Sequence, residues 1–120
     1  MKDLVDGGIF VLDNVHFESD SYLINDIAKE VIFEFTDYLI INNNLIVEVN
    51  GFTDNIGDSL YNQTLSEKRA LAVCNLIQSK GIDLKRIAYN GFGERFPVSE
   101  NNSVEGRSKN RRTEIKVVSK

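Results

Sequence analysis

Residues 45–58 have the sequence LIVEVNGFTDNIGD, in which the pattern of a buried strand is followed by a polar loop. Its first part alternates apolar side chains at Leu45, Val47 and Val49, which is the pattern of a β-strand with one buried face. A polar loop over 53–58 follows the strand directly. In sheets whose strands alternate with helices, ligands bind just beyond the carboxyl ends of strands. The stretch therefore predicts a strand that ends in a candidate binding loop.

Helical periods flank this strand on both sides. Before it, apolar residues recur every four positions and predict a helix over 21–41: Leu23, Ile27, Val31, Phe35 and Leu39. Candidate N-caps of this helix are Ser19, Asp20 and Ser21. After the strand, a second helix begins either at Asp58 or at the capping-box pattern over 64–67, and it ends near Lys80–Gly81.

Three further strands are expected at 9–17, 86–93 and 112–118, with a long polar loop over 94–110 that is either functional or disordered. Helices long enough to cross over favour parallel neighbours in the sheet. The fold class predicted is α/β (α+β), a two-layer sandwich in the order βαβαββ. Its mixed four-stranded sheet carries both main helices on one face, and the last two strands pair in either direction.

Composition excludes several classes of function. The chain has 120 residues, which suffices for one domain, and no apolar run long enough to span a membrane. One cysteine and one histidine exclude an internal disulfide, a cysteine zinc site and any site built on paired imidazoles. His16 is expected to be a packed or surface residue and Cys74 a buried structural one. No nucleophile motif or acid–base pair is present, so we expect neither an enzyme nor a cofactor nor a bound metal.

Charge is distributed unevenly along the chain. Residues 1–60 contain 12 acidic and 2 basic side chains (net −10), and residues 61–120 contain 6 acidic and 12 basic ones (net +6), which sums to −4. Read alone, the C-terminal cations suggest a nucleic-acid surface. The aromatic residues that stack on single strands are not interleaved with them, and the overall charge is acidic. We therefore expect no nucleic-acid partner, and we expect several of these cations to pair with carboxylates of the first half.

Three polar groups stand out at the predicted strand ends. Thr53-Asp54-Asn55 follows a strand, and Asn110-Arg111-Arg112 precedes one. On the second helix, Asn62, Ser66 and Arg69 share a face that is expected to differ from the one carrying Ala70, Val73 and Ile77. A carboxylate at Asp54 and a guanidinium at Arg69 could clamp the ammonium and carboxylate of a zwitterion. The alternative is a simple salt bridge between Asp54 and Arg69 that holds the loop to the helix.

The order and spacing of several sequence motifs resemble those of a known protein family. Gly51-Phe52-Thr53-Asp54-Asn55-x-Gly57 is followed by Asn62-x-x-Leu65-Ser66-x-x-Arg69-Ala70, and later by Gly91-x-Gly93-Glu94 and Asn110-Arg111-Arg112-x-Glu114-Ile115. In this order and spacing the chain resembles the OmpA-like C-terminal domain. That family includes periplasmic domains of outer-membrane proteins, the peptidoglycan-associated lipoprotein and flagellar stator proteins. The resemblance covers roughly residues 8–118, and residues 1–7 are interpreted as an N-terminal extension or an added remnant.

The resemblance implies non-covalent binding of peptidoglycan through the meso-diaminopimelate residue of its stem peptide. Family members hold the free amino group of that residue with the position matching Asp54 and its carboxylate with the position matching Arg69. The other matching positions that line or brace the family's pocket are Asn62, Thr53, Asn55, Gly57, Leu65 and Arg112. Phe52 departs from the histidine common in the family, which puts contacts from that position in question.

The resemblance also carries expectations about place and partners. It implies a periplasmic module attached to the outer membrane through its parent protein, with a homodimer among the expected assemblies. The N-terminus lacks the pattern of a signal peptide, so the chain as written would stay in the cytoplasm unless it is a domain of a longer exported protein. Contact with a membrane is expected only through an anchor or partner domain absent from this sequence. The alternative function is protein docking or oligomerisation in an envelope complex, without peptidoglycan binding.

Overall fold

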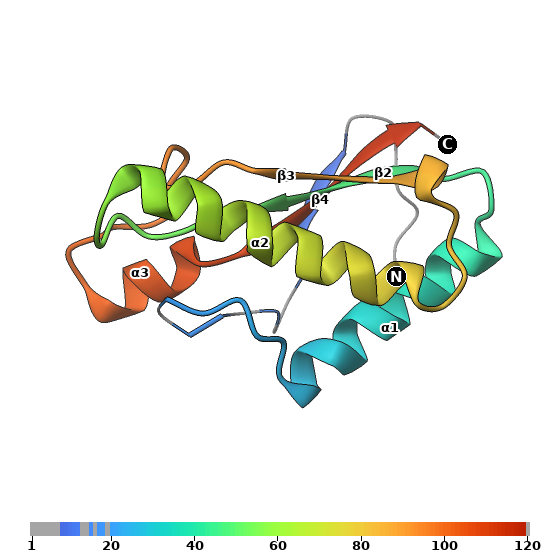
Figure 1. Ribbon diagram of the computed structural model, residues 1–120, viewed down its shortest axis with the longest axis horizontal. Coiled ribbons are helices and arrows are strands. Elements are labelled where there is room, and N and C mark those ends of the chain that lie inside the picture. Colours follow the sequence, from blue (N-terminus) through green and yellow to red (C-terminus); the bar gives the residue numbers. More distant parts are fainter. Residues whose placement is uncertain (1–7, 13–14, 16, 19, 120) are drawn as a thin grey trace.

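The computed structural model describes residues 8–12, 15, 17–18 and 20–119. Its elements are β1 (Ile9–Val11), α1 (Asp26–Ile41), β2 (Ile46–Gly51), α2 (Ser59–Gln78), a 3₁₀ turn (Leu84–Arg86), β3 (Ile87–Gly91), α3 (Val104–Asn110) and β4 (Thr113–Ser119). The long helix α2 crosses the sheet, α1 lies beside it on the same side, and α3 sits near the N-terminal end of α2 (Figure 1). The mixed α+β class predicted from the sequence is therefore confirmed.

The sheet contains both parallel and antiparallel pairs, in the order β1-β4-β2-β3. β2 pairs in parallel with β3, with Gly51 opposite Gly91, and antiparallel with β4, with Gly51 opposite Thr113. β1 adds an antiparallel edge to β4. The carboxyl ends of β2 and β3 and the start of β4 therefore meet at one end of the sheet, where the polar loop 53–58 begins.

One face of the sheet carries the core. Val47 and Val49 of β2 and Ile115 and Val117 of β4 are fully buried against the two helices. The intervening residues of each strand lie on the opposite, uncovered face, as the two-residue period of a strand requires. Parity along a strand thus decides whether a side chain faces the helices or the open surface.

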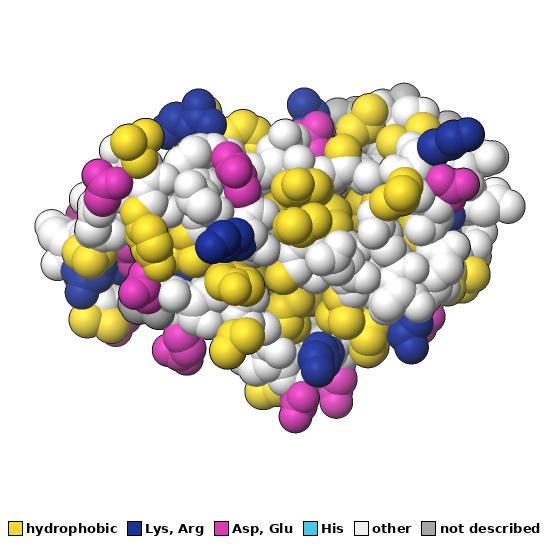
Figure 2. Space-filling view, viewed as in Figure 1, with side chains coloured by type: hydrophobic (Ala, Val, Ile, Leu, Met, Phe, Trp, Pro, Cys, Tyr) yellow, Lys and Arg dark blue, Asp and Glu magenta, His cyan; other side chains and the backbone are white. Residues whose placement is uncertain are grey.

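The buried stripe of α1 agrees with the predicted one in part, since Phe35 and Leu39 are buried as expected. Leu23 and Ile27 are 77% and 63% exposed, whereas the buried positions are Ala28, Ile32, Phe35, Thr36 and Leu39. The helix begins at Asp26, because the side chain of Asn25 caps it by accepting a hydrogen bond from the amide of Ala28 at 2.8 Å. Asn25 is not one of the predicted caps. Apolar side chains are consequently interspersed with charged ones on the surface seen in Figure 2.

The predicted element order is wrong at one place, because the loop over 94–110 contains α3. Ser103 caps this seven-residue helix by accepting from the amide of Gly106 at 3.0 Å. The first strand is also shorter than predicted and ends at Val11. His16 lies outside the described residues. For α2, Asp58 is the N-cap of the two alternatives, since it accepts from the amide of Tyr61 at 3.1 Å.

The inward face of α2 is continuous, contrary to the prediction of two separate faces. Asn62, Ser66 and Arg69 are buried together with Ala70 and Val73 along the same side of the helix. Its first half buries polar side chains and its second half buries apolar ones. The polar half lies over the strand ends, where the polar loop also lies, so the helix closes the core at one end and contributes to a pocket at the other.

Cys74 supplies a test of this packing. It is 1% exposed, its Sγ lies 3.6 Å from the carbonyl oxygen of Ala88, and burial raises the pKa of the thiol to about 12. Since the thiolate is the reactive form, we expect a disulfide reagent at pH 8 to label the folded protein about 1000-fold more slowly than the protein in 8 M urea. Stoichiometric labelling of the folded protein within seconds would contradict this burial.

The raised pKa of Cys74 also affects stability at high pH. Since the thiol of the unfolded chain ionises first, the free energy of unfolding falls as the pH rises from 9 to 12.

Candidate functional site

A pocket of about 330 Å³ opens at the end of the sheet, between the loop after β2 and the first turns of α2. Its lining combines two carboxylates and two guanidiniums with small and apolar groups. The lining residues are Asp20, Thr53, Asp54, Ile56, Gly57, Tyr61, Asn62, Leu65, Arg69 and Arg111. The carboxylates and guanidiniums balance formally, so the pocket suits a ligand that carries both signs of charge.

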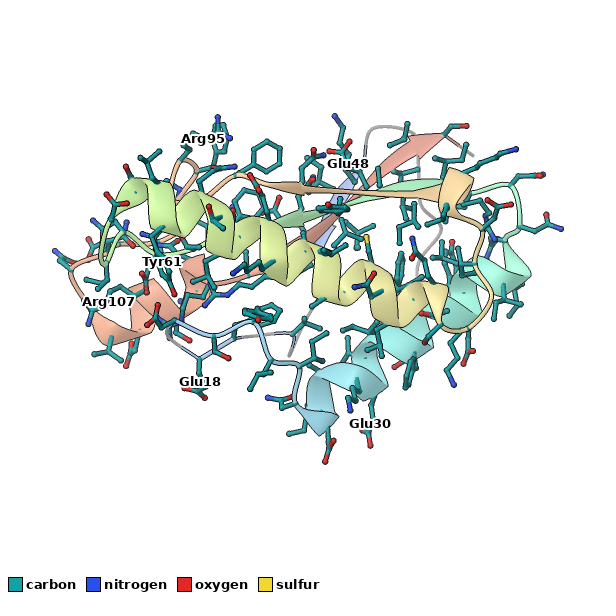
Figure 3. The ribbon with its side chains drawn as sticks, in the orientation of Figure 1. Glu18, Glu30, Glu48, Tyr61, Arg95 and Arg107 are labelled. Carbon is teal, nitrogen blue, oxygen red and sulfur yellow. The ribbon has the colours of Figure 1, made fainter. Side chains whose placement is uncertain are left out.

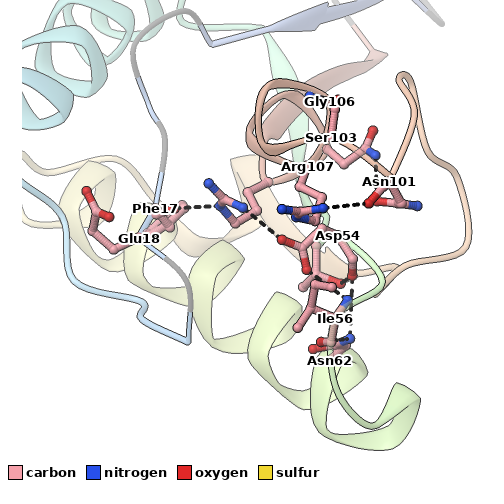
Figure 4. Close-up of polar contacts among 12 residues, drawn as sticks. Phe17, Glu18, Asp54, Ile56, Asn62, Asn101, Ser103, Gly106 and Arg107 are labelled. Carbon is pink, nitrogen blue, oxygen red and sulfur yellow. Dashed lines mark hydrogen bonds and ion pairs between the residues drawn. The ribbon is translucent and has the colours of Figure 1, made fainter.

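Asp54 is held by both of its oxygens. Oδ1 accepts from the amide of Ile56 at 3.1 Å, a turn geometry that aspartate favours. Oδ2 pairs with Nη1 of Arg111 at 2.8 Å (Figure 4). The Asp54–Arg69 salt bridge considered from the sequence is absent from the described residues, and Arg111 takes that place. The ion pair joins the acidic and basic halves of the chain.

Arg69 is buried more completely than any other charged side chain in the described part of the chain, at 1% exposure. Nε donates to the carbonyl of Ser21 at 2.7 Å, and Nη2 donates to that of Glu18 at 3.0 Å. Burial first, and then the neighbouring Arg111, lower the pKa of Arg69 to about 10, while Asp54 acts in the opposite direction. Its Nη1 has no hydrogen-bond partner among the described residues.

Asn62 and Thr53 shape the loop beside these charges. The side-chain nitrogen Nδ2 of Asn62 donates to the carbonyl of Ile56 at 3.0 Å. It also makes longer contacts of 3.4 Å with the carbonyl of Asp54 and with the carboxylate of Glu94. The amide of Thr53 donates to the carbonyl of Gly93 at 2.9 Å. These bonds fix the loop between α2 and the segment after β3, so that the Asp54 side chain is presented to the pocket.

Tyr61 and Asp20 stand at the rim of the pocket. Both are exposed, and a hydrogen bond to the Asp20 carboxylate is the first cause that raises the pKa of Tyr61. Figure 3 shows Tyr61 on α2 at the same end of the molecule as Glu18, whose segment precedes α1. Neither residue was predicted to belong to the site: Asp20 was considered only as a helix cap, and a single aromatic residue such as Tyr61 in a polar stretch gives no distinctive signal.

The structure brings together most of the residues predicted for the site. Thr53, Asp54, Gly57, Asn62, Leu65 and Arg69 all line the pocket. Asn55 is exposed and does not line it. Arg112 also lies elsewhere, and its neighbour Arg111 enters instead. Arg112 was predicted to line or brace the pocket, and it does not line it. The backbone just before β4 continues the alternation of that strand, since the amide of Phe52 donates to the carbonyl of Arg112 at 3.0 Å, so neighbouring side chains lie on opposite faces.

Arg112 belongs to an aromatic cluster on the open face of the sheet. Its guanidinium carbon lies 3.8 Å from the ring centre of Phe52, and Phe52 stacks on Phe92 at 5.4 Å. Nε of Arg112 pairs with Glu114 at 2.7 Å, and Nη2 donates to the carbonyl of Phe96 at 2.9 Å. Phe52 is thus a packing residue on the far side of the sheet, so its departure from histidine does not touch the pocket.

Ion pairing between the two halves of the chain is less extensive than predicted. Within the described ranges, the two ion pairs are Asp54–Arg111 and Arg112–Glu114, and only the first joins the acidic and basic halves. Other cations bind carbonyl groups, as Arg107 does with Asn101 at 3.0 Å. Across the same ranges, no helix has the combination of length and apolar content needed to cross a bilayer.

Sequence comparison finds a family model and relatives that match this chain. The model of the OmpA family matches residues 16–111. Outer membrane porin F of Pseudomonas aeruginosa is 35% identical over 105 residues, which cover 87% of this chain and 30% of the porin. The chain spans less than half the length of each curated relative described by these comparisons.

Solved structures show the same architecture. The peptidoglycan-associated lipoprotein from Burkholderia pseudomallei superposes with a TM-score of 0.82 at 27% identity, covering 86% of this chain and 87% of that one. The cell wall anchor of the T6SS from Pseudomonas aeruginosa superposes with a TM-score of 0.75 at 31% identity, covering 93% of this chain and 80% of that one.

Proposed function

We propose, since this chain belongs to the OmpA family, that it binds peptidoglycan non-covalently and carries out no reaction on it. The binding module spans residues 8–118. Its ligand is the diaminopimelate residue of the stem peptide, whose free side-chain end carries one ammonium and one carboxylate. The matched proteins named as a peptidoglycan-associated lipoprotein and as a cell wall anchor support this function.

The observation that carries the proposal is the unpartnered Nη1 of Arg69. A buried cationic donor without an acceptor is costly, and a ligand carboxylate would supply the missing partner. Asp54 lies across the same pocket and provides negative charge for the ammonium. Each oxygen of Asp54 already accepts one hydrogen bond and retains a second lone pair for the ligand.

Access to Arg69 requires a small movement. Nη1 itself has less than 1 Å² of exposed surface, so a ligand reaches it only when neighbouring atoms move aside. The two charge-assisted contacts made by one stem peptide give modest affinity. A cell wall presents many such peptides, and repeated sites raise the effective concentration and the retention time.

The proposed location follows from the ligand. Relatives named as outer membrane proteins and lipoproteins place comparable modules in the envelope. We place this module in the periplasm, attached to the outer membrane through its parent protein. Such a module anchors the outer membrane, or a complex within it, to the cell wall.

The test is calorimetric titration with two stem tripeptides. One ends in meso-diaminopimelate, and the other carries lysine at that position and lacks the side-chain carboxylate. We expect the first to bind at least about tenfold more tightly, because losing one charge-assisted contact costs roughly 1.5–3 kcal/mol. Equal affinities would refute recognition of the carboxylate. Failure to bind either peptide would remove the proposed function in favour of protein docking.

A further inference from the structure

Four described residues before α1 lie beside the pocket, and we name them the pocket strap: Phe17, Glu18, Asp20 and Ser21. Both pocket arginines donate to its backbone. Nε of Arg111 donates to the carbonyl of Phe17 at 3.1 Å, and Arg69 binds the carbonyls of Glu18 and Ser21 at 3.0 and 2.7 Å. The side chain of Phe17 also lies under the guanidinium of Arg69 at 5.1 Å. The strap is therefore fastened on both sides of Asp20.

Asp20 has an unusual backbone conformation. Its φ is +66°, and it alone among the described non-glycine residues has a positive φ. This left-handed conformation is unfavourable for a residue with a side chain, although aspartate and asparagine tolerate it better than most. The flanking carbonyl contacts hold the turn in place. In this backbone conformation, the Asp20 carboxylate lines the pocket.

The two pocket carboxylates differ in their engagement. Asp54 is 7% exposed, paired with Arg111 and bonded to the amide of Ile56. Asp20 is exposed and takes part in no ion pair among the described residues, and its neighbour there is the hydroxyl of Tyr61. An incoming ammonium would have to share Asp54 with a guanidinium 2.8 Å away, whereas Asp20, although it attracts Arg69, has no cation within ion-pair distance among the described residues.

We propose that Asp20 is the residue that makes this pocket selective for ligands with a free ammonium group. Asp54, whose charge is shared with Arg111, then contributes to the affinity for both kinds of ligand, and Asp20 supplies the negative charge that an acylated amine cannot use. The inference rests on the proposed function and refines it: the module distinguishes stem peptides whose side-chain amine is free from those in which it is blocked by acylation.

A merely structural role of Asp20 predicts a different outcome. If its side chain only supports the turn, an Asp20→Asn variant should behave as wild type, because asparagine tolerates the same backbone conformation and keeps the volume. If the charge is the determinant, Asp20→Asn should lose selectivity while it stays folded. The comparison therefore measures selectivity and not affinity alone.

The experiment titrates each protein with two ligands, the diaminopimelate tripeptide and the same tripeptide N-acetylated on its side-chain amine. For wild type we expect the free amine to bind at least tenfold more tightly. For Asp20→Asn we expect the ratio to fall to threefold or less, and for Asp54→Asn we expect it to stay near the wild-type ratio with weaker binding of both ligands. Glu30→Gln is the matched charge control, because Glu30 lies on α1 well away from Tyr61 (Figure 3).

The outcomes separate the two proposals. Absence of tripeptide binding by wild type overturns the proposed function itself. If wild type binds but Asp20→Asn keeps the full ratio, or wild type does not distinguish the two ligands, the function stands and the role of Asp20 is refuted. Urea unfolding of each variant checks that a lost ratio reflects lost charge and not a lost fold.

Discussion

Alanine at position 51 is expected to lower the free energy of unfolding by about 3 kcal/mol, at the upper end of what overpacking in a core costs. Gly51 ends β2 where α2 crosses the sheet. An added Cβ would run into the backbone carbonyl oxygen of Ser66 and would lie 3.4 Å from the amide nitrogen of Ala70. Backbone atoms within a helix cannot rotate away, so α2 as a whole must move off the sheet. Urea unfolding followed by circular dichroism measures the loss.

Gly57→Ala is the matched control for this substitution. Gly57 has a φ of +90° and no atom within 4 Å of an added Cβ, so its alanine variant carries only backbone strain. That strain is about 1–2 kcal/mol. We therefore expect Gly51→Ala to be clearly the less stable of the two. An unfolding midpoint for Gly51→Ala equal to that of wild type would show that α2 and β2 are not in the close contact described.

Methionine at position 69 is expected to weaken binding of the diaminopimelate tripeptide by tenfold to about a hundredfold, the equivalent of one charge-assisted hydrogen bond. The variant removes the unpartnered Nη1 and the two bonds that fasten the pocket strap at Glu18 and Ser21. Stability should change less than affinity, because an apolar side chain of similar length often replaces a buried charge at little cost. Calorimetry measures the affinity, and amide hydrogen exchange over 20–25 reports release of the strap.

Arg86→Met is the control for that variant. Arg86 is bonded in the same manner, with Nε donating to the carbonyl of Leu45 at 3.1 Å and Nη2 to that of Leu39 at 2.7 Å, but it lies outside the pocket. We expect Arg86→Met to keep the wild-type affinity, with a change in stability comparable to that of Arg69→Met. If Arg69→Met binds the tripeptide as tightly as wild type, Arg69 serves the fold alone and the carboxylate is held by another group.

The elements that follow from local signals were predictable. The first four residues of β2 alternate in burial, as their sequence predicts. For α2 the sequence predicted the helix and offered Asp58 as one of two N-caps, and the structure selects Asp58. α3 could not be predicted in this way. It has seven residues and a mostly polar sequence, and it depends on contacts outside itself, since the Asn110 side chain binds the amides of Val98 and Ser99 at 2.8 and 3.0 Å.

The candidate site was predictable in part for similar reasons. Asp54 follows a strand and Arg69 lies on the next helix, and a carboxylate and a guanidinium in these positions were expected to bind a ligand with both charges. The pocket strap was not predictable, because its contacts come from backbone carbonyls, which any sequence provides. The placement of Arg111 was available from parity: Ile115 and Val117 face the helices, and counting back by two reaches Thr113 and then Arg111. Arg112 has the parity of Glu114, whose face is open.

The doubled arginine at the start of β4 has a consequence for how the strand is kept in place. Arg111 and Arg112 directly precede β4 and have identical side chains. The side chains themselves therefore do not determine which guanidinium enters the pocket. A slip by one residue would simply exchange them and preserve the pocket's cation, but it would turn Ile115 and Val117 out of the core. A register shift of one residue would therefore leave the charge of the pocket unchanged but would disrupt the core. The register of β4 is thus determined by apolar residues that do not line the pocket.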